Sequence, residues 1–298
     1  MTQEMINTFL NVYKYGNMTS AAANTFTTQS NMSKQIKLLE EELGVTLLIR
    51  KKGHASITLT PHGEAFLKLA QDYQSLMKEF EQIKNINDLT DISIGALDRM
   101  NTFTLVNYYR YALKAHPQIR LDTHTRHTRE IYALMESNQL DLGFVTAFLP
   151  VNNVKITPLF EEDMCVVTSK DTDLGEIISP DELDPSLEIY SRWSDEFEIW
   201  HEQYWPGRDY RMHLGTASMA PDYLSEKGRW TIMPVGTLQT LLSSYELSFH
   251  HLNVDTPKTT VYLLESKNPH PNRIDLINTI KQEMIDYLQT NTLLRMLK

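Results

Sequence analysis

The stretch that most constrains the fold runs from Thr19 to Gly44, because it predicts two short helices joined by a polar turn. Thr19 is the expected N-cap of the first helix, and the alanines that follow it allow a second helix to cross closely. The second helix is expected to begin near Gln29 and to end at Gly44, a residue suited to a left-handed C-cap. Its apolar stripe consists of Met32, Ile36, Leu39 and Leu43. This pattern is typical of a helix-turn-helix.

The beginning of the second helix carries short, hydrogen-bonding side chains. Side chains of this kind can reach base edges when a helix N-terminus enters the DNA major groove. An ordinary αα-hairpin, with its serines and asparagines serving only as caps, is the alternative. The residues that we expect to contact DNA here are Thr28, Gln29, Ser30, Asn31, Ser33, Lys34 and Lys37.

A basic segment follows the helix pair. It lies between an apolar run that ends at Ile49 and a second short run that begins at Ile57, which predicts a hairpin with a basic tip. A hairpin in this place corresponds to a wing whose cations contact phosphates rather than bases. The residues assigned to this contact are Arg50, Lys51, Lys52 and His54.

A long helix is predicted to begin at Pro61, with Thr60 as its N-cap. Apolar residues then recur at alternating spacings of three and four, which fills both core positions of a heptad pattern. We interpret this narrow stripe as a dimer seam, the alternative being a helix packed on the C-terminal part of its own chain. The stripe consists of Phe66, Leu69, Tyr73, Leu76, Phe80 and Ile83.

Residues 16–64 resemble the N-terminal domain of LysR-type transcriptional regulators. Thr25, Ser30 and Leu48 depart from the residues usual in that family at those positions. The resemblance implies a winged helix-turn-helix, a linker helix that forms a dimer, and binding to a roughly two-fold symmetric site on double-stranded DNA as a homodimer or homotetramer. It is carried by Gly16, Ala21, Ala22, Gln29, Ser33, Gln35, Ile36, Leu39, Glu40, Leu43, Gly44, Leu47, Arg50, Leu59, Thr60, Pro61 and Gly63.

The net charge of −10 argues at first against DNA binding, but the charge is unevenly distributed. Residues 1–60 hold six lysines and arginines against four glutamates, so they carry +2 and the remainder of the chain carries −12. The basic groups lie on the proposed recognition helix and wing. A modest positive charge in each subunit also implies that more than one copy must contact the DNA.

Composition indicates a globular protein, with 41% hydrophobic and 22% charged residues and no apolar run long enough to span a membrane. The first residues form an amphipathic helix rather than a signal peptide. The single cysteine, Cys165, excludes an internal disulfide framework and suits a reducing cytoplasm. We therefore expect a cytoplasmic protein without a membrane partner.

From residue 89 onward strands alternate with helices, which predicts a parallel or mixed α/β sheet. This part resembles the two-lobed effector domain of the LysR family, a periplasmic-binding-protein-like arrangement, although KGRWTIMP at Gly228 departs from the family's glycine-rich pattern. The expected domains are 1–60 (winged helix-turn-helix), 61–88 (linker) and 89–298 (effector binding). Lobe I is expected at about 89–163 and 265–298, and lobe II at about 164–264.

Two α/β lobes form a cleft at the carboxyl ends of their strands, where helix N-termini favour anionic ligands. The resemblance places Arg99 in a position that contacts the effector, which suggests a carboxylate or phosphate; pairing with Asp98 or another acid is equally open. Thr128 is a candidate for ligand contact or for helix capping alone. The aromatic stretch 190–205 is either a pocket wall or a helix packed on lobe II. The assigned effector contacts are Arg99, Met100, Thr102, Thr128, Thr146, Ser191 and Arg192.

These features predict a DNA-binding transcriptional regulator that senses a small, anionic metabolite and needs no cofactor. A cytoplasmic sensor without a DNA role is one alternative, because the C-terminal part has the layout of a solute-binding protein. An enzyme is the other, but the chain lacks G-x-S-x-G, phosphate-loop and H-E-x-x-H motifs and cysteine clusters. The histidines His124, His127, His250 and His251 are not assigned to a metal.

Overall fold

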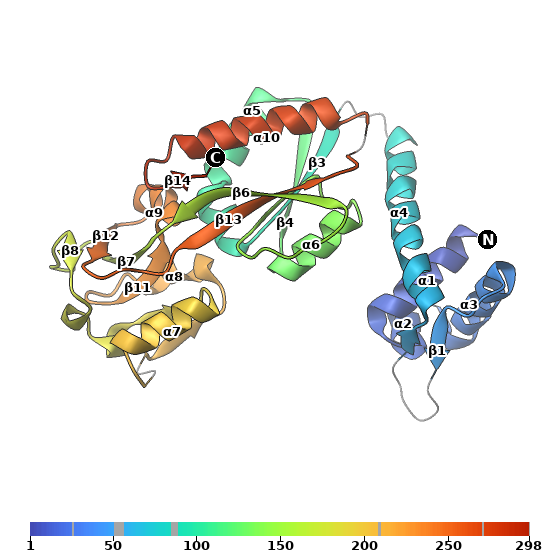
Figure 1. The fold of residues 1–298 in the computed structure, drawn as a ribbon, viewed down its shortest axis with the longest axis horizontal. Helices are drawn as coiled ribbons and strands as arrows, with labels where there is room; N and C mark the ends of the chain where they lie inside the picture. The colour runs from blue at the N-terminus through green and yellow to red at the C-terminus, as the bar shows by residue number, and fades with distance from the viewer. Residues whose placement is uncertain (26, 51–56, 85–88, 208–209, 270, 298) are drawn as a thin grey trace. The chain divides into compact units, whose positions relative to one another are not determined.

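The computed structural model describes the chain except for residues 26, 51–56, 85–88, 208–209, 270 and 298, together with the side chains of 50, 75, 78–79 and 81–84. The chain divides into two compact units, Met1–Asn87 and Asp88–Lys298, and each is described by itself (Figure 1). Across the described residues, no helix combines the length and the apolar character needed to cross a membrane.

The first unit is a helical bundle with a β-hairpin and a long C-terminal helix, as the sequence predicted. Its elements are α1 (Gln3–Tyr15), α2 (Met18–Asn24), α3 (Gln29–Leu43), β1 (Leu48–Arg50), β2 (Ile57–Leu59) and α4 (Pro61–Lys84). The strands β1 and β2 pair antiparallel, with Leu48 opposite Leu59 and Arg50 opposite Ile57.

Side-chain caps set the helix boundaries of this unit. Thr28 caps α3 by accepting a hydrogen bond from the backbone of Asn31 at 3.2 Å, and Gly44 ends the helix in the left-handed region with φ of 69°. The assignment of Thr19 as the cap of α2 was wrong. Asn17 takes this place and accepts a hydrogen bond from the Ser20 N–H at 2.7 Å. Helix α2 therefore begins at Met18, before Thr19, rather than after it.

The wing is attached to α3 by one carboxylate. Oε1 of Glu40 accepts hydrogen bonds from the backbone N–H groups of Leu47 at 2.7 Å and Leu48 at 3.1 Å. At the start of α4, Gly63 lies so close to the carbonyl oxygen of Leu47 that a Cβ at this position would overlap it. Only glycine therefore allows α4 to pack against the chain that enters the wing.

Helix α4 has two different faces, and this divides the predicted dimer stripe. Phe66 is 8% exposed and packs edge-to-face on Phe9 at 5.0 Å between ring centroids, and Tyr73 packs partly buried against the same core. The assignment of Phe66 to the seam is corrected accordingly, because Phe66 completes the core of its own unit, whereas the assignment of Tyr73 stays a prediction. Leu69, Leu76 and Phe80 are 64%, 50% and 52% exposed. The side chain of Ile83 lies outside the described residues.

The second unit contains an α/β fold. Its strands are β3 (Thr90–Ala96), β4 (Ile119–Thr125), β5 (Leu142–Val145), β6 (Val154–Glu162), β7 (Met164–Ser169), β8 (Ile177–Ile178), β9 (Ile189–Ser191), β10 (Met212–Leu214), β11 (Trp230–Pro234), β12 (Leu247–Leu252), β13 (Thr259–Ser266) and β14 (Arg295–Met296). Its helices are α5 (Val106–Ala115), α6 (Thr128–Glu136), α7 (Asp195–Tyr204), α8 (Ala220–Tyr223), α9 (Leu238–Ser244) and α10 (Ile274–Gln289). Single turns lie at Met100–Thr104 (a π-helix), Pro180–Glu182, Pro185–Leu187, Ala217–Met219 and Val235–Thr237.

The strands form two larger sheets, one in each lobe. Lobe I has the order β14-β6-β13-β5-β3-β4, with β3, β4 and β5 parallel, and lobe II has the order β11-β7-β12-β8. The chain returns to lobe I at Thr259 rather than at 265, because β13 pairs along its whole length with β6 and also with β5. The predicted limit of lobe II at 264 is therefore corrected to the residues before β13.

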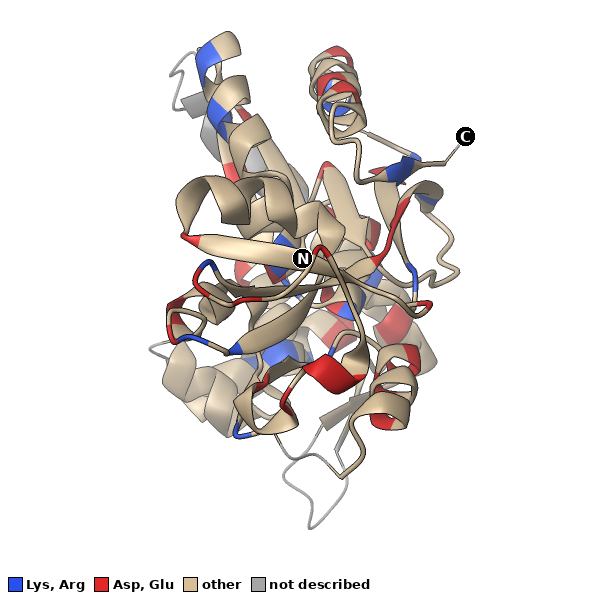
Figure 2. Ribbon diagram, turned by 90° about the vertical axis from the view of Figure 1, so that its left-hand side faces the viewer, with Lys and Arg blue, Asp and Glu red and all other residues tan. Residues whose placement is uncertain are grey.

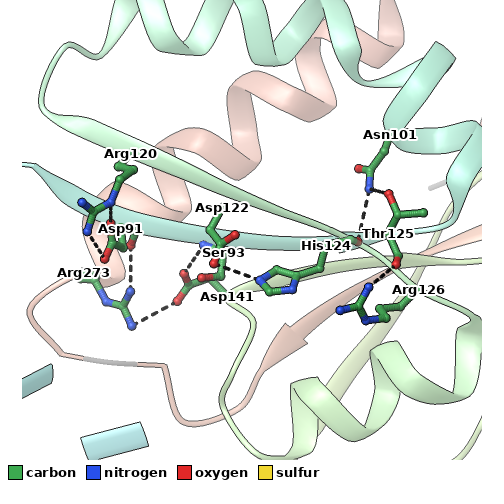
Figure 3. Close-up of polar contacts among 10 residues, drawn as sticks. All are labelled: Asp91, Ser93, Asn101, Arg120, Asp122, His124, Thr125, Arg126, Asp141 and Arg273. Carbon is green, nitrogen blue, oxygen red and sulfur yellow. Dashed lines mark hydrogen bonds and ion pairs between the residues drawn. The ribbon is translucent and has the colours of Figure 1, made fainter. Parts of the chain in front are cut away.

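Helices cover both faces of the lobe I sheet (Figure 1). Helices α5 and α10 bury apolar residues such as Tyr108 and Ile280 on one face, whereas α6 packs Ile131 on the other. At the N-terminal ends of the strands, Asp91 pairs with Arg120 at 2.5 Å, and Arg273 donates to the Asp91 carbonyl oxygen at 2.8 Å (Figure 3). These contacts attach the entrance of α10 to the sheet.

The two faces of α4 lead to a stability prediction. Phe66→Ala removes a ring from a closed core, so the free energy of unfolding of the first unit should fall by about 3–5 kcal/mol. Lys68→Ala, an exposed position on the same helix, should change it by less than about 0.5 kcal/mol. Urea unfolding of both variants, at one protein concentration, checks this. If the two variants unfold with equal free energy, Phe66 does not belong to the core of the first unit and is again a candidate for the dimer seam.

Candidate functional site

The polar start of α3 forms an exposed surface opposite the buried side of the helix. Met32, Ile36 and Leu39 are buried against α1 and α2. The residues assigned to DNA are exposed or half-buried, and Leu43, expected on the apolar stripe, is 37% exposed at the helix end. The predicted contact set on this surface is Thr28, Gln29, Ser30, Asn31, Ser33, Lys34 and Lys37.

Two contacts organise this surface without removing its hydrogen-bonding capacity. Asn31 Nδ2 donates to Thr27 Oγ1 at 3.2 Å, which orients its amide along the turn. Lys37 lies 3.5 Å from Glu41 in an exposed i,i+4 pair, and exposed pairs of this type contribute little stability. Both side chains can therefore exchange these partners for a ligand at small cost.

The predicted wing contacts remain predictions. Lys51, Lys52 and His54 lie outside the described residues, as does the side chain of Arg50, whose backbone closes β1. The strands β1 and β2, which flank these residues in the sequence, pair with each other.

The second unit contains a cavity of about 790 Å³ whose walls come from both lobes. Its polar lining combines arginines, hydroxyls and two carboxylates, and its apolar lining includes one tryptophan. The lining residues are Leu97, Asp98, Arg99, Thr125, Arg126, His127, Thr128, Arg129, Glu130, Thr146, Ser191, Arg192, Trp193, Leu214, Gly215, Thr216, Ala217 and Thr259.

Arg99 is engaged in a buried ion pair with Glu162. Its Nη2 lies 2.5 Å from Glu162 Oε1, the two side chains are 4% and 0% exposed, and Oε2 of Glu162 accepts from the Gly236 N–H at 3.1 Å. Burial raises the pKa of Glu162, and the Arg99 guanidinium acts in the opposite direction. The alternative in which Arg99 pairs with an acid is therefore the one observed, but the partner is the buried Glu162 and not Asp98 or a surface acid. A buried charge requires such a close partner.

The neighbours of Arg99 also differ from their predicted roles. Met100 is fully buried in the lobe I core, where its sulfur accepts from Arg99 Nη1 at 3.7 Å. Neither Met100 nor Thr102 is among the residues that line the cavity. Both residues belong to the π-helical turn Met100–Thr104, which packs Met100 into the core of lobe I. We withdraw both residues from the effector set.

Asp98 and Arg99 together hold the lobes in a defined arrangement. The Asp98 carboxylate accepts hydrogen bonds from the backbone N–H of Ser218 at 3.0 Å and from its hydroxyl at 3.1 Å. Ser218 belongs to lobe II, so two consecutive residues of lobe I contact lobe II or its entry strand. Sequence reasoning did not find Asp98 as an interlobe residue, because its partner lies 120 positions away.

The rim of the cavity in lobe I is the N-terminus of α6. His127 is the N-cap residue, not Thr128 as expected, and its N–H donates to Glu130 Oε2 at 3.0 Å. Thr128 is therefore the first residue of α6 and lines the cavity. Asn101 Nδ2 donates to Thr125 Oγ1 at 3.0 Å, and Arg126 donates to the Thr125 carbonyl at 2.8 Å (Figure 3). These bonds fix the loop that carries the arginines.

The aromatic stretch 190–205 mostly forms the core of lobe II, which confirms the packing alternative for most of its rings. Phe197, Trp200 and Trp205 are at most 8% exposed and cluster there, whereas Trp193 also lines the cavity. Ser191 and Arg192 line the cavity as well. Arg192 is half exposed and pairs with Asp195 at 2.6 Å and Glu198 at 3.0 Å, so its charge is already shared.

The buried pair leads to a second stability prediction. Arg99→Met should lower the free energy of unfolding by about 3–5 kcal/mol, because it leaves the Glu162 carboxylate buried without its cation. The double variant Arg99→Met/Glu162→Gln should be less destabilised than the single variant, since no unpaired charge remains. Urea unfolding followed by near-UV circular dichroism checks this. An equal loss in both variants would show that the pair has no role beyond packing.

Comparison with known proteins agrees with this architecture. Residues 4–64 match the family described as "Bacterial regulatory helix-turn-helix protein, lysR family", and residues 90–284 match "LysR substrate binding domain". The chain is 29% identical over 172 residues to the HTH-type transcriptional regulator CysL of Bacillus subtilis, covering 56% of each chain. It is 27% identical over 158 residues to a probable RuBisCO transcriptional regulator of Trieres chinensis, covering 51% of this chain and 50% of the other. The chain thus spans about half the length of the curated relatives it matches.

Solved structures show the same fold at low identity. A full-length OxyR variant from Pseudomonas aeruginosa has a TM-score of 0.63 at 17% identity, with 100% of this chain and 98% of the other covered. Full-length CbnR complexed with target DNA has a TM-score of 0.60 at 18% identity, with 95% and 100% covered. Because the match to the substrate-binding domain alone covers more than half of the residues, the chain belongs to the LysR family.

Proposed function

We propose that this protein is a DNA-binding transcriptional regulator that uses α3 to read operator sequence. The observation that carries the proposal is the exposed N-terminal turn of α3, where Gln29, Ser30 and Lys34 project from a rigid, capped helix. Short polar side chains at a helix N-terminus fit the major groove, where each base pair has a distinct hydrogen-bond pattern. The family to which the chain belongs, and the DNA complex of CbnR with the same fold, support this reading.

The distribution of charge is consistent with this assignment. The positive balance of residues 1–60 contrasts with the −12 carried by the remainder. In lobe II, which faces the viewer in Figure 2, Asp and Glu outnumber Lys and Arg, and helix α7 carries acidic residues without a lysine or arginine. DNA would therefore be attracted to the first unit, and the second unit would be held away from phosphates. Access to DNA places the protein in the cytoplasm in this proposal.

The exposed face of α4 supports assembly into a homodimer. Leu69, Leu76 and Phe80 leave large apolar side chains in water, and heptad-like spacing allows a second copy of α4 to cover them. A dimer would present two recognition helices to a roughly two-fold symmetric operator. A homotetramer formed by two such dimers is also compatible with this proposal, because each dimer would present two recognition helices to the DNA.

The cavity in the second unit is the proposed effector site. We assign to it Arg126, Thr128, Arg129, Thr146 and Arg192, all of which line it. A helix N-terminus next to arginines favours a small anionic metabolite. Binding would favour one arrangement of the two lobes over others, and this shift would change how the protein contacts DNA. No catalytic step is part of the proposal.

A footprinting experiment tests the proposed function. The purified protein should protect a roughly two-fold symmetric segment upstream of its own or a neighbouring gene. Gln29→Ala should abolish this protection or weaken binding roughly five- to a hundredfold, because it removes a base contact. Gln74→Ala, an exposed glutamine on α4 away from the seam positions, should bind as the wild type does. Equal loss in both variants, or no protection at any salt concentration with or without metabolite extract, contradicts the proposal.

A second experiment tests the seam. Leu76→Ala should raise the dimer dissociation constant at least about tenfold, because each copy loses buried apolar surface at the interface. Protomer stability should be nearly unchanged, since Leu76 is exposed within its own unit. Sedimentation velocity over a range of concentrations measures this, with Lys68→Ala as the control. An unaltered dissociation constant for Leu76→Ala would remove α4 from the dimer interface.

A further inference from the structure

We propose that the effector carries its anionic group on a flat, unsaturated ring, with the ring against Trp193 and the anion beside Arg126 and Arg129. This inference rests on the proposed function, because it takes the cavity of the second unit as the effector site. It goes further by naming the chemical class of the ligand.

Trp193 is a pre-organised wall of the cavity. It is the second residue after β9, and its Nε1–H donates to the Ile232 carbonyl oxygen of β11 at 2.8 Å, which fixes the orientation of the indole. The guanidinium carbon of Arg99 lies 6.0 Å from the ring centroid, and Arg99 is itself fixed by Glu162. Since the only polar atom of the side chain is already bonded, the ring offers the cavity apolar surface alone.

The rest of the lining suits a flat ring in contact with that surface. Leu97, Leu214 and Ala217 supply neighbouring aliphatic surface, and threonine hydroxyls lie among them. A rigid aromatic wall interacts more favourably with another aromatic ring than with a saturated ring of equal size, because stacked or edge-to-face geometry adds to area burial. A wall that is ordered before binding also lowers the entropy cost of association.

The cations available to the anion lie on the rim of lobe I. Arg99 and Arg192 are paired with carboxylates, as described above. Arg126 and Arg129 have no carboxylate partner in the part of the chain that the structure describes, and the guanidinium of Arg126 donates to the Thr125 carbonyl oxygen. Arg126 precedes the N-cap residue of α6 and Arg129 lies in its first turn, so a carboxylate or phosphate at this place meets guanidinium groups and a helix N-terminus together.

The test uses matched pairs of anions that differ only in ring unsaturation. Benzoate is compared with cyclohexanecarboxylate, and phenyl phosphate with cyclohexyl phosphate, by calorimetric titration of the full-length protein. One or both unsaturated anions should bind roughly three- to tenfold more tightly than the saturated counterpart. The pair with the higher affinity identifies the anionic group. Binding should also change tryptophan fluorescence.

Variants connect the preference to Trp193. Trp193→Phe should retain the preference but lose the fluorescence change, whereas Trp193→Leu should bind both members of a pair equally. Trp200→Phe, which replaces a ring of the lobe II core that does not line the cavity, should keep the preference and the fluorescence change. Arg129→Ala should weaken both members of a pair equally, because it removes charge and not ring contact. Circular dichroism and DNA binding of each variant confirm that it is folded.

Equal affinity within each pair, or no binding by any of the four anions, overturns the inference. A fluorescence change that persists in Trp193→Phe overturns the placement of the ring. If the wild-type protein still protects its operator, neither of these two results contradicts the proposal that the protein is a transcriptional regulator. Loss of operator protection in the wild-type protein contradicts the regulator itself, so the two failures are distinguishable.

Discussion

The second unit depends on the neutralisation of one buried charge. Glu162 ends β6, the strand that leads from lobe I to lobe II, and it is closed off from water by Arg99 and by the backbone of Gly236. A Cβ on residue 236 would overlap the Glu162 carboxylate, so the glycine is needed for this approach. The pair thereby joins the π-helical turn of lobe I, the crossing strand and the first turn after β11. It also removes one arginine from the charges that a ligand can use.

This constraint changes how the cavity is understood. A count of arginines near the cavity suggests a strongly basic site, but Arg99 and Arg192 are balanced by acids within hydrogen-bonding distance. What remains is a local excess of positive charge on the rim of lobe I and an aromatic wall in lobe II. In the proposed effector site, selectivity would then come from the separation of these two features and not from overall charge.

Sequence patterns predicted the local elements well, because local physics determines them. The start of α3 near Gln29, the Gly44 terminus and the alternation of strands and helices from residue 89 each depend on a few neighbouring residues. Errors arose where distant residues decide the outcome. The pairing of Arg99 with Glu162, 63 positions away, and of Asp98 with Ser218 could not be inferred from spacing. Phe66 fits the heptad pattern of α4 equally well as a seam or a core residue, and only its contact with Phe9 decides between them.

Helix α4 serves two purposes along one continuous rod of 24 residues, which is about 36 Å long at 1.5 Å per residue. Its first turns are locked into the core of the first unit through Phe66 and Gly63, and the exposed stripe continues beyond them without a break in the helix. In the proposed dimer no flexible joint separates the seam from α3. The seam then sets the distance and rotation between the two recognition helices. The dimer would therefore select operators by the spacing of their half-sites as well as by their base sequence. An inserted base pair, which shifts one half-site along and around the duplex, would be tolerated less well than a substituted one.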